Sequence, residues 1–358
     1  MAELQAFALR DIPHRIHGRT GTPDITGTED IALFWGGSAL EVKISASELW
    51  VDLSVDFETF EPWILIEING ALIGRQMLHR GRQKLCLFRN FDTTLVHTVK
   101  LIKDTQAMND DDEKIHSLVI HGIEAADAKF FTPDEHPYKF EFIGDSITSG
   151  EGLRGAHEEM QWITPWMSTI NHYGVATARH FNAEYRFVSQ GGWGVITGWD
   201  GNLKHTIPSI YKKICGVTHG ERNMKMGSQH DYDFTSWQPD AVIINLGTND
   251  ATAFSTNVAK VTRGQFVDAA VEFLKTVRAD NPKAYIVWIY GMCETNLIRE
   301  IGTAVSRYIA ETGDERIAYQ TAVTMTEQSF GSRQHPGPLI HEKAANQLIS
   351  FLSQVLAK

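Results

Sequence analysis

The pattern of hydrophobic residues changes near residue 138, and this change constrains the fold more than any other feature of the sequence. Before it, apolar and polar residues alternate over short segments, such as 40–45 and 49–55, as they do in half-buried antiparallel strands. After it, apolar strand-like segments alternate with helical ones, which indicates parallel βαβ units. We therefore predict a jelly-roll β-sandwich at residues 1–130, a linker at 131–138 and an α/β domain at 139–358.

Local signals agree with this division. Asn69-Gly70 separates two strand-like segments, and this dipeptide favours a type I′ hairpin. In the second region, Thr262 and Gln265 have the spacing of a capping box, which predicts a helix at 263–280. A further helix is expected near 203–215. The α/β domain is predicted to be a doubly wound three-layer sandwich with a parallel sheet.

Composition excludes several classes of protein. A formal net charge of −11 argues against a nucleic-acid partner, since no broad basic face could neutralise phosphates. Residues 1–21 contain no apolar segment, so they do not resemble a signal peptide, and no later segment is long and apolar enough to span a bilayer. Three widely spaced cysteines give no disulfide framework. We expect a cytoplasmic protein without a membrane partner, or a secreted one if a leader has been trimmed.

Ser146 lies where a strand-like segment, residues 139–144, runs into Gly-Asp-Ser. In open α/β sheets, sites form beyond the carboxyl ends of the strands, so this hydroxyl would lie at the edge of the sheet. A hydroxyl is a poor nucleophile until a base removes its proton. Because Gly-Asp-Ser is also a common turn sequence, it indicates a nucleophile only together with a base and an oxyanion trap.

Three later segments supply such groups. A glycine cluster at 191–194 follows the next strand, Asn249 follows the third, and His335 precedes the last helix. Loops after successive parallel strands meet on one edge, so these residues can share a pocket with Ser146. Acyl transfer needs a nucleophile, a base and donors for an oxyanion, and this set contains all three.

These four blocks, in this order, resemble those of the SGNH (GDSL-type) hydrolase superfamily. With a β-sandwich in front, the chain resembles carbohydrate esterase family 2, whose members are acetyl esterases acting on plant polysaccharides. The resemblance implies that Ser146 is the nucleophile and His335 the base. It also implies an oxyanion hole of Ser146, Asn249 and a glycine, with Gly192 preferred over Gly194.

One position departs from the superfamily pattern. An aspartate usually lies three residues before the histidine, whereas this chain has Ser332 there. We therefore predict a Ser146–His335 dyad in which a backbone carbonyl holds the imidazole, although a carboxylate from elsewhere in the fold could do so.

The predicted function is that of a serine esterase, without metal or cofactor, that removes acetyl groups from carbohydrates. His335 and His341 lack the accompanying ligands of a metal site. Trp193 and Trp199 flank the glycine cluster and are predicted to stack on sugar rings, with Trp193 favoured. The alternatives are a short-chain lipid or thioester hydrolase, and a catalytically spent carbohydrate-binding protein. The oligomeric state stays open, with a homo-oligomer as one option.

Overall fold

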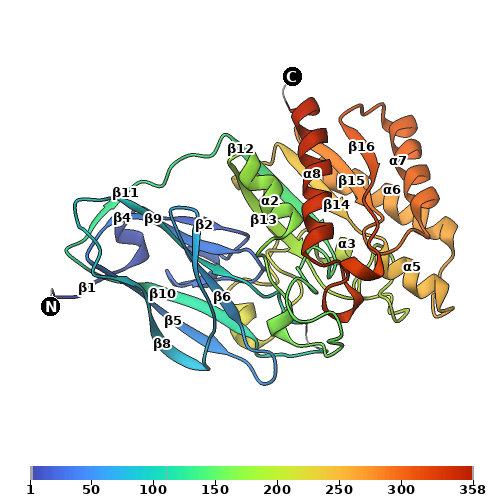
Figure 1. Cartoon of the computed structure of the whole chain (residues 1–358). Helices are drawn as coiled ribbons and strands as arrows, with labels where there is room; N and C mark the ends of the chain where they lie inside the picture. Colours follow the sequence, from blue (N-terminus) through green and yellow to red (C-terminus); the bar gives the residue numbers. More distant parts are fainter. Residues whose placement is uncertain (1–2, 110, 357–358) are drawn as a thin grey trace. The chain divides into compact units, whose positions relative to one another are not determined.

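The computed structural model describes residues 3–109 and 111–356, and the chain forms two compact units (Figure 1). The first unit contains residues 1–135 together with 213–231. The second contains residues 136–212 and 232–358. Segment 213–231, which lies inside the range predicted for the α/β domain, thus belongs by its contacts to the first unit.

Two antiparallel sheets make up the first unit, and residues from both share one apolar core, among them Val42, Leu53 and Ile120. One sheet has the order β1-β10-β5-β8, with β3 beside β10, and the other has the order β11-β4-β9-β6-β7, with β2 beside β4. The strands are β1 (Gln5–Phe7), β2 (Arg15–His17), β3 (Ile31–Ala32), β4 (Ala39–Ser45), β5 (Glu48–Asp56), β6 (Trp63–Ile68), β7 (Ala71–Met77), β8 (Gly81–Arg89), β9 (His97–Lys103), β10 (Ser117–Ala126) and β11 (Lys129–Phe131). The short helices of this unit are η1 (Leu9–Asp11), α1 (Pro23–Thr26) and α4 (Glu221–Lys225).

The predicted hairpin is confirmed. Asn69 and Gly70 have φ angles of 51° and 80°, the left-handed conformation that a type I′ turn requires, and they join β6 to β7. Segment 213–231 is held by polar contacts within the same unit. The Trp35 indole donates to the Ile214 carbonyl at 2.9 Å, and the Asn223 amide donates to the His116 carbonyl at 3.0 Å.

The second unit contains a five-stranded parallel sheet in the order β13-β12-β14-β15-β16, which confirms the predicted α/β domain. Figure 1 shows α2 and α8 on one face of the sheet and α6 and α7 on the other. The elements are β12 (Tyr138–Gly144), η2 (Thr164–Trp166), α2 (Tyr173–His180), β13 (Ala183–Ser189), α3 (Ile207–Ile210), η3 (Phe234–Ser236), β14 (Ala241–Asn245), α5 (Thr248–Ser255), α6 (Arg263–Asp280), β15 (Tyr285–Tyr290), α7 (Ile298–Thr312), β16 (Ile317–Thr321), η4 (Glu327–Ser329), η5 (Ser332–Gln334) and α8 (Pro338–Val355).

The sequence signal at Thr262 positions α6 as expected, and one helix prediction is wrong. The Thr262–Gln265 capping box is formed, and α6 covers the predicted residues. The helix expected at 203–215 is reduced to the four residues of α3. Beyond α3, the backbone N–H of Ile214 donates to the His230 carbonyl, so this part of the chain makes tertiary rather than helical bonds.

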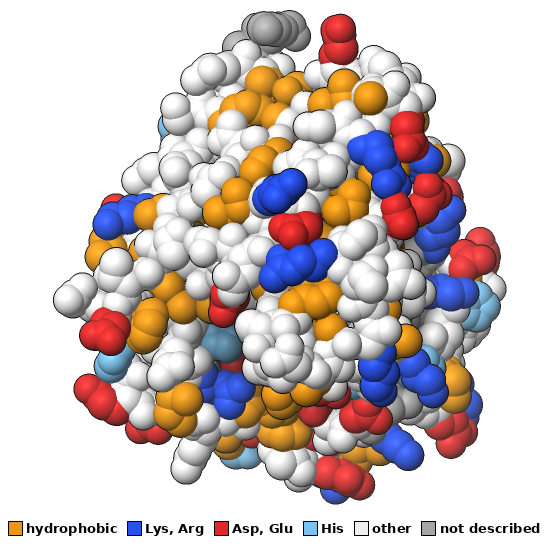
Figure 2. All heavy atoms as spheres, turned by 90° about the vertical axis from the view of Figure 1, so that its right-hand side faces the viewer, with side chains coloured by type: hydrophobic (Ala, Val, Ile, Leu, Met, Phe, Trp, Pro, Cys, Tyr) orange, Lys and Arg blue, Asp and Glu red, His pale blue; other side chains and the backbone are white. Residues whose placement is uncertain are grey.

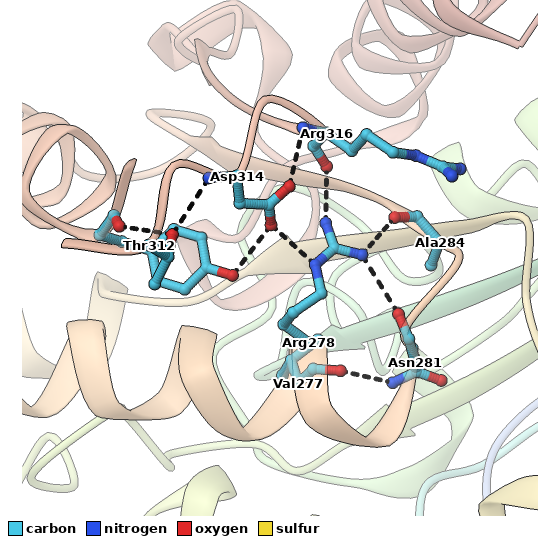
Figure 3. A network of polar contacts seen from close by, with 8 residues as sticks. Val277, Arg278, Asn281, Ala284, Thr312, Asp314 and Arg316 are labelled. Atoms are coloured by element: carbon cyan, nitrogen blue, oxygen red, sulfur yellow. Dashed lines mark hydrogen bonds and ion pairs between the residues drawn. The ribbon is translucent and has the colours of Figure 1, made fainter. Parts of the chain in front are cut away.

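At the amino ends of β15 and β16, a polar network centred on Arg278 joins α6 to the loops before these strands (Figure 3). The Arg278 guanidinium donates to Asp314 Oδ2 at 2.7 Å and to the carbonyls of Ala284, Asn281 and Arg316. Asp314 also accepts from the Tyr308 hydroxyl at 2.9 Å. This network lies at the amino edge of the sheet, which is formed by the amino ends of its strands. The predicted site lies at the opposite edge.

The surface in Figure 2 shows basic and acidic side chains intermingled, without a continuous basic area on that face. Ion pairs of this kind join Arg307 to Asp268 and Arg263 to Glu300. None of the helices in the described part of the chain combines the length and hydrophobicity needed to span a bilayer.

Candidate active site

Four loops bring the predicted residues to the carboxyl edge of the second unit's sheet, which is the edge formed by the carboxyl ends of its strands. Ser146 follows β12, Gly192 follows β13, and Asn249 lies in the first turn of α5 after β14. His335 comes from the loop before α8. Parallel strands all end at the same edge, which explains why residues nearly 200 positions apart in sequence (146 and 335) meet there.

The Ser146 hydroxyl lies 2.9 Å from His335 Nε2. The other ring nitrogen, Nδ1, lies 3.0 Å from the backbone carbonyl of Arg333. A carbonyl can only accept a hydrogen bond, so Nδ1 must carry the proton and Nε2 must present its lone pair to the serine. This tautomer is the one that a general base needs.

The loop that carries His335 has an unusual backbone. Arg333 and Gln334 have φ angles of 55° and 54°, the left-handed region that costs non-glycine residues of order 1–3 kcal/mol each. The loop is closed by hydrogen bonds from Gly331 N to the His335 carbonyl and from His335 N to the Ser332 carbonyl. Gly152, with φ of 85°, packs directly against it, since a Cβ there would lie 2.5 Å from His335 Cβ.

Ser332, the residue that occupies the usual aspartate position, does not orient the imidazole. Its side chain is buried, and its hydroxyl has no hydrogen-bond partner among the described residues. The Arg333 carbonyl makes the contact to Nδ1 instead.

Asn249 and the glycine cluster lie beside each other. The Asn249 side-chain nitrogen donates to the Trp193 carbonyl at 2.9 Å, which uses one of its two N–H groups and fixes the direction of the other. The backbone N–H of Gly194 donates to the His205 carbonyl at 3.1 Å. Within the described residues no such bond engages the N–H of Gly192, so of the two glycines Gly192 keeps its donor for a ligand.

Two buried aspartates support these loops. Asp250 accepts hydrogen bonds from the backbone N–H groups of Val195, Ile196 and Thr197 at 2.8–3.2 Å, although burial raises its pKa to about 6. Asp145 accepts from Ile147 N at 3.0 Å, and burial raises its pKa to about 7. Both carboxylates shape the backbone around the site.

The two tryptophans differ in exposure. Trp193 is only 7% exposed and stacks on the His205 ring, with 5.2 Å between ring centroids. Trp199 is 58% exposed, and its indole lies over Gly192, where a Cβ would come within 3.1 Å of Trp199 Cδ1. Trp193 therefore packs in the interior, while Trp199 offers an open ring, and which of them contacts a sugar stays a prediction.

His341 is fully buried away from solvent, and its Nδ1 accepts from the backbone N–H of Tyr173 at 3.1 Å. It thus fixes the first turn of α2. The described residues contain no group of three or more His, Cys, Asp or Glu side chains placed to hold a metal ion. Cys86, Cys215 and Cys293 are free thiols.

Sequence reasoning missed Glu151 and Arg333. The Glu151 side chain is only 4% exposed, and it pairs with Arg333 Nε at 2.5 Å. Its other oxygen lies 3.8 Å from His335 Nε2. The available signal was a pair of opposite charges, one just after the nucleophile's turn and one just before the base.

Comparisons with known proteins identify the family to which this fold belongs. Residues 140–348 match the family described as GDSL-like lipase/acylhydrolase. An acetyl xylan esterase from the rumen bacterium Butyrivibrio proteoclasticus superimposes with a TM-score of 0.93 at 40% sequence identity, over 99% of both chains. A family two carbohydrate esterase from Clostridium thermocellum, solved with cellohexaose, superimposes with a TM-score of 0.82 at 22% identity, over 96% of this chain and 99% of that one.

Among curated proteins, an acetylxylan esterase/glucomannan deacetylase from Cellvibrio japonicus is 26% identical over 99% of this chain and 92% of its own length. The matched family covers more than half of the chain, and the Butyrivibrio enzyme aligns along nearly all of it. The chain therefore belongs to the GDSL-like lipase/acylhydrolase (SGNH hydrolase) family, and the relatives that match it along nearly all of its length include acetylxylan esterases.

Proposed function

We propose that this protein is a serine esterase that removes O-acetyl groups from plant polysaccharides or their oligosaccharides, of the acetylxylan or acetylmannan type. The observation that carries the proposal is the 2.9 Å contact between Ser146 Oγ and His335 Nε2, with Nδ1 held by a carbonyl. A hydroxyl facing the lone pair of a fixed imidazole is the arrangement that acyl transfer requires.

In the proposed reaction, Ser146 Oγ attacks the acetyl carbonyl carbon while His335 Nε2 takes the hydroxyl proton. The backbone N–H groups of Ser146 and Gly192 and the free N–H of the Asn249 amide stabilise the oxyanion. When the intermediate collapses, His335 returns the proton to the sugar oxygen, which leaves as an alcohol. Water then attacks the acetyl-serine ester while His335 takes one of its protons. His335 returns this proton to Ser146 Oγ as the ester bond breaks, and acetic acid leaves and ionises to acetate.

The substrate class rests on the relatives. The Butyrivibrio and Cellvibrio proteins are named as acetyl xylan esterases, the latter also as a glucomannan deacetylase. The exposed ring of Trp199 beside Gly192 supports a sugar substrate, since aromatic faces stack on apolar faces of sugar rings. We further propose that the two antiparallel sheets of the first unit form a β-sandwich of the jelly-roll type.

The first experiment measures turnover of an aryl acetate. We expect hydrolysis by the wild-type protein and none by Ser146→Ala. A wild-type protein that binds xylo-oligosaccharides without turnover would instead be a spent carbohydrate-binding protein, and the proposal would fail.

The second experiment separates the acetyl-carbohydrate function from a lipid or thioester hydrolase. kcat/KM is measured for aryl esters from acetate to octanoate, and products are analysed with acetylated xylo- and manno-oligosaccharides. We expect the rate to fall with acyl length and free acetate to appear from the oligosaccharides. A rate that rises with acyl length would favour the lipid function.

A further inference from the structure

We propose that Glu151 is a positioning residue for the catalytic base and acts through Arg333. On this view it takes the place of the aspartate that this chain lacks at position 332. The inference rests on the proposed esterase function.

Glu151 lies close to both members of the proposed dyad. It lies on the turn that follows Ser146, and its backbone N–H donates to the Ser146 carbonyl at 2.9 Å. Its side chain is buried, with 4% exposure, and points at the loop that carries His335. A buried carboxylate is costly unless it is paired, so its partner must be held firmly.

That partner is Arg333, whose Nε donates to Glu151 Oε1 at 2.5 Å. Two further bonds fix the same residue, from its backbone N–H to the Glu159 carbonyl at 2.6 Å and from Nη1 to the Met160 carbonyl at 3.2 Å. Arg333 is therefore anchored by its side chain and by its backbone.

The backbone of Arg333 needs this anchoring. With φ of 55° it lies in the left-handed region, where only glycine is free of strain. This conformation directs the Arg333 carbonyl at His335 Nδ1, 3.0 Å away. If Arg333 relaxed to ordinary angles, the carbonyl would turn away and the imidazole would lose its fixed tautomer.

Glu151 also lies 3.8 Å from His335 Nε2, so a direct charge effect on the imidazole is the competing explanation. The distance is too long for a hydrogen bond, and the carboxylate already neutralises Arg333. Other charged or titratable groups near His335 are Arg333 itself and the buried His341, while Asp145 lies close to Glu151. Substitutions of Glu151 and Arg333, alone and combined, separate the two explanations without relying on pH.

Wild-type turnover of an aryl acetate is measured first, because its absence would refute the esterase function rather than this inference. Glu151→Gln keeps the shape of the side chain and removes its charge. We expect kcat to fall about 10- to 100-fold while KM stays within about threefold, as for a misplaced catalytic group. Glu158→Gln, which removes the same charge from an exposed side chain nearby, should leave both constants unchanged.

Two substitutions of Arg333 then test whether its backbone conformation is what holds His335 in place. Glycine adopts a φ of 55° without strain, whereas alanine does not. Arg333→Gly should therefore retain at least about fivefold more kcat than Arg333→Ala, and equal rates would overturn the proposal. Thermal unfolding of each variant confirms that it is folded.

The decisive combination is Glu151→Gln in the Arg333→Gly background. In that background the arginine side chain that Glu151 holds is absent. If Glu151 acts through Arg333, adding Glu151→Gln should therefore change kcat by less than about threefold. A full Glu151→Gln effect in that background would show that the carboxylate acts on the imidazole directly, and would contradict the positioning role. An unchanged kcat in the single variant Glu151→Gln would contradict it as well.

Discussion

Two arginine–carboxylate pairs lie at opposite edges of the same parallel sheet, and they support different things. At the amino edge, Arg278 pairs with Asp314 at 2.7 Å and donates to three backbone carbonyls (Figure 3). At the carboxyl edge, Arg333 pairs with Glu151 at 2.5 Å. Arg278 lies in a regular helix, whereas Arg333 has a left-handed backbone. The first pair joins loops, and the second holds a strained turn beside the proposed base.

Two buried polar atoms at the carboxyl edge, Asp145 Oδ2 and Ser332 Oγ, have no hydrogen-bond partner among the described residues. An unsatisfied buried group costs stability, so these two atoms lower the free energy of unfolding.

The pKa values of the edge aspartates shift in opposite directions. Burial raises the pKa of Asp145 to about 7. Burial would also raise the pKa of Asp314, but the Arg316 backbone N–H and the Arg278 guanidinium outweigh it and hold that pKa below its usual range. Ionisation of Asp145 at the carboxyl edge therefore opposes folding, whereas ionisation of Asp314 at the amino edge favours it.

The comparison predicts, first, a large kinetic effect at the carboxyl edge. Asn249→Ala removes an oxyanion donor and should lower kcat by about 10²–10³ while KM stays within a few-fold. Steady-state kinetics on an aryl acetate provide the measurement. A change confined to KM would mean that Asn249 binds the ground state and not the transition state.

The second prediction concerns the amino edge and stability. Arg278→Ala removes four donor contacts and leaves Asp314 without its cation, so the second unit should lose about 3 kcal/mol of unfolding free energy. The kcat of the folded protein should be unchanged. Urea unfolding measures the loss of stability, and kinetics on the same sample measure kcat. A loss of kcat without a loss of stability would mean that the Arg278 network supports catalysis, as the carboxyl edge is proposed to do.

The third prediction is a difference in pH dependence between Asp145→Asn and Asp314→Asn. A raised native pKa means that the stability contributed by Asp145 is full below pH 3.8 and is lost as pH rises through about 7. Asp145→Asn should thus stabilise the protein by about 2 kcal/mol near pH 8 and have little effect near pH 4.

The stability contributed by Asp314 depends on pH in the opposite direction. Its stability contribution is present above its unfolded pKa and is lost as pH falls through the lower native value. Asp314→Asn should therefore destabilise the protein near pH 7 and have little effect in acid. Unfolding midpoints of the two variants, measured across pH, should diverge in opposite directions, and parallel curves would contradict the comparison.

Much of this arrangement follows from local sequence patterns. The Thr262–Gln265 capping box, the Asn69-Gly70 turn and the parallel α/β sheet are determined by short-range chemistry and periodicity, and all were predictable. The meeting of Ser146 with His335 was predictable as well, because loops at the carboxyl ends of parallel strands share an edge.

Features that depend on tertiary contacts were not predictable. A helix was expected near 203–215, but only Ile207–Ile210 is helical, and the backbone N–H of Ile214 donates to the carbonyl of His230. Similarly, nothing local distinguishes Trp193 from Trp199, since their exposure depends on whether His205 covers the ring. The Glu151–Arg333 pair spans 182 positions, and two isolated charges in a sequence do not reveal which partner each will find.

In the proposed dyad, His335 works with Ser146 and is held by the Arg333 carbonyl, without a side chain from position 332. The most direct measurement compares kcat/KM of His335→Ala and Ser332→Ala on one aryl acetate. We expect a fall of more than ~10³ for His335→Ala and a change within about tenfold for Ser332→Ala. Equal and severe losses in the two variants would make Ser332 a true third member of the site and would rule out the dyad.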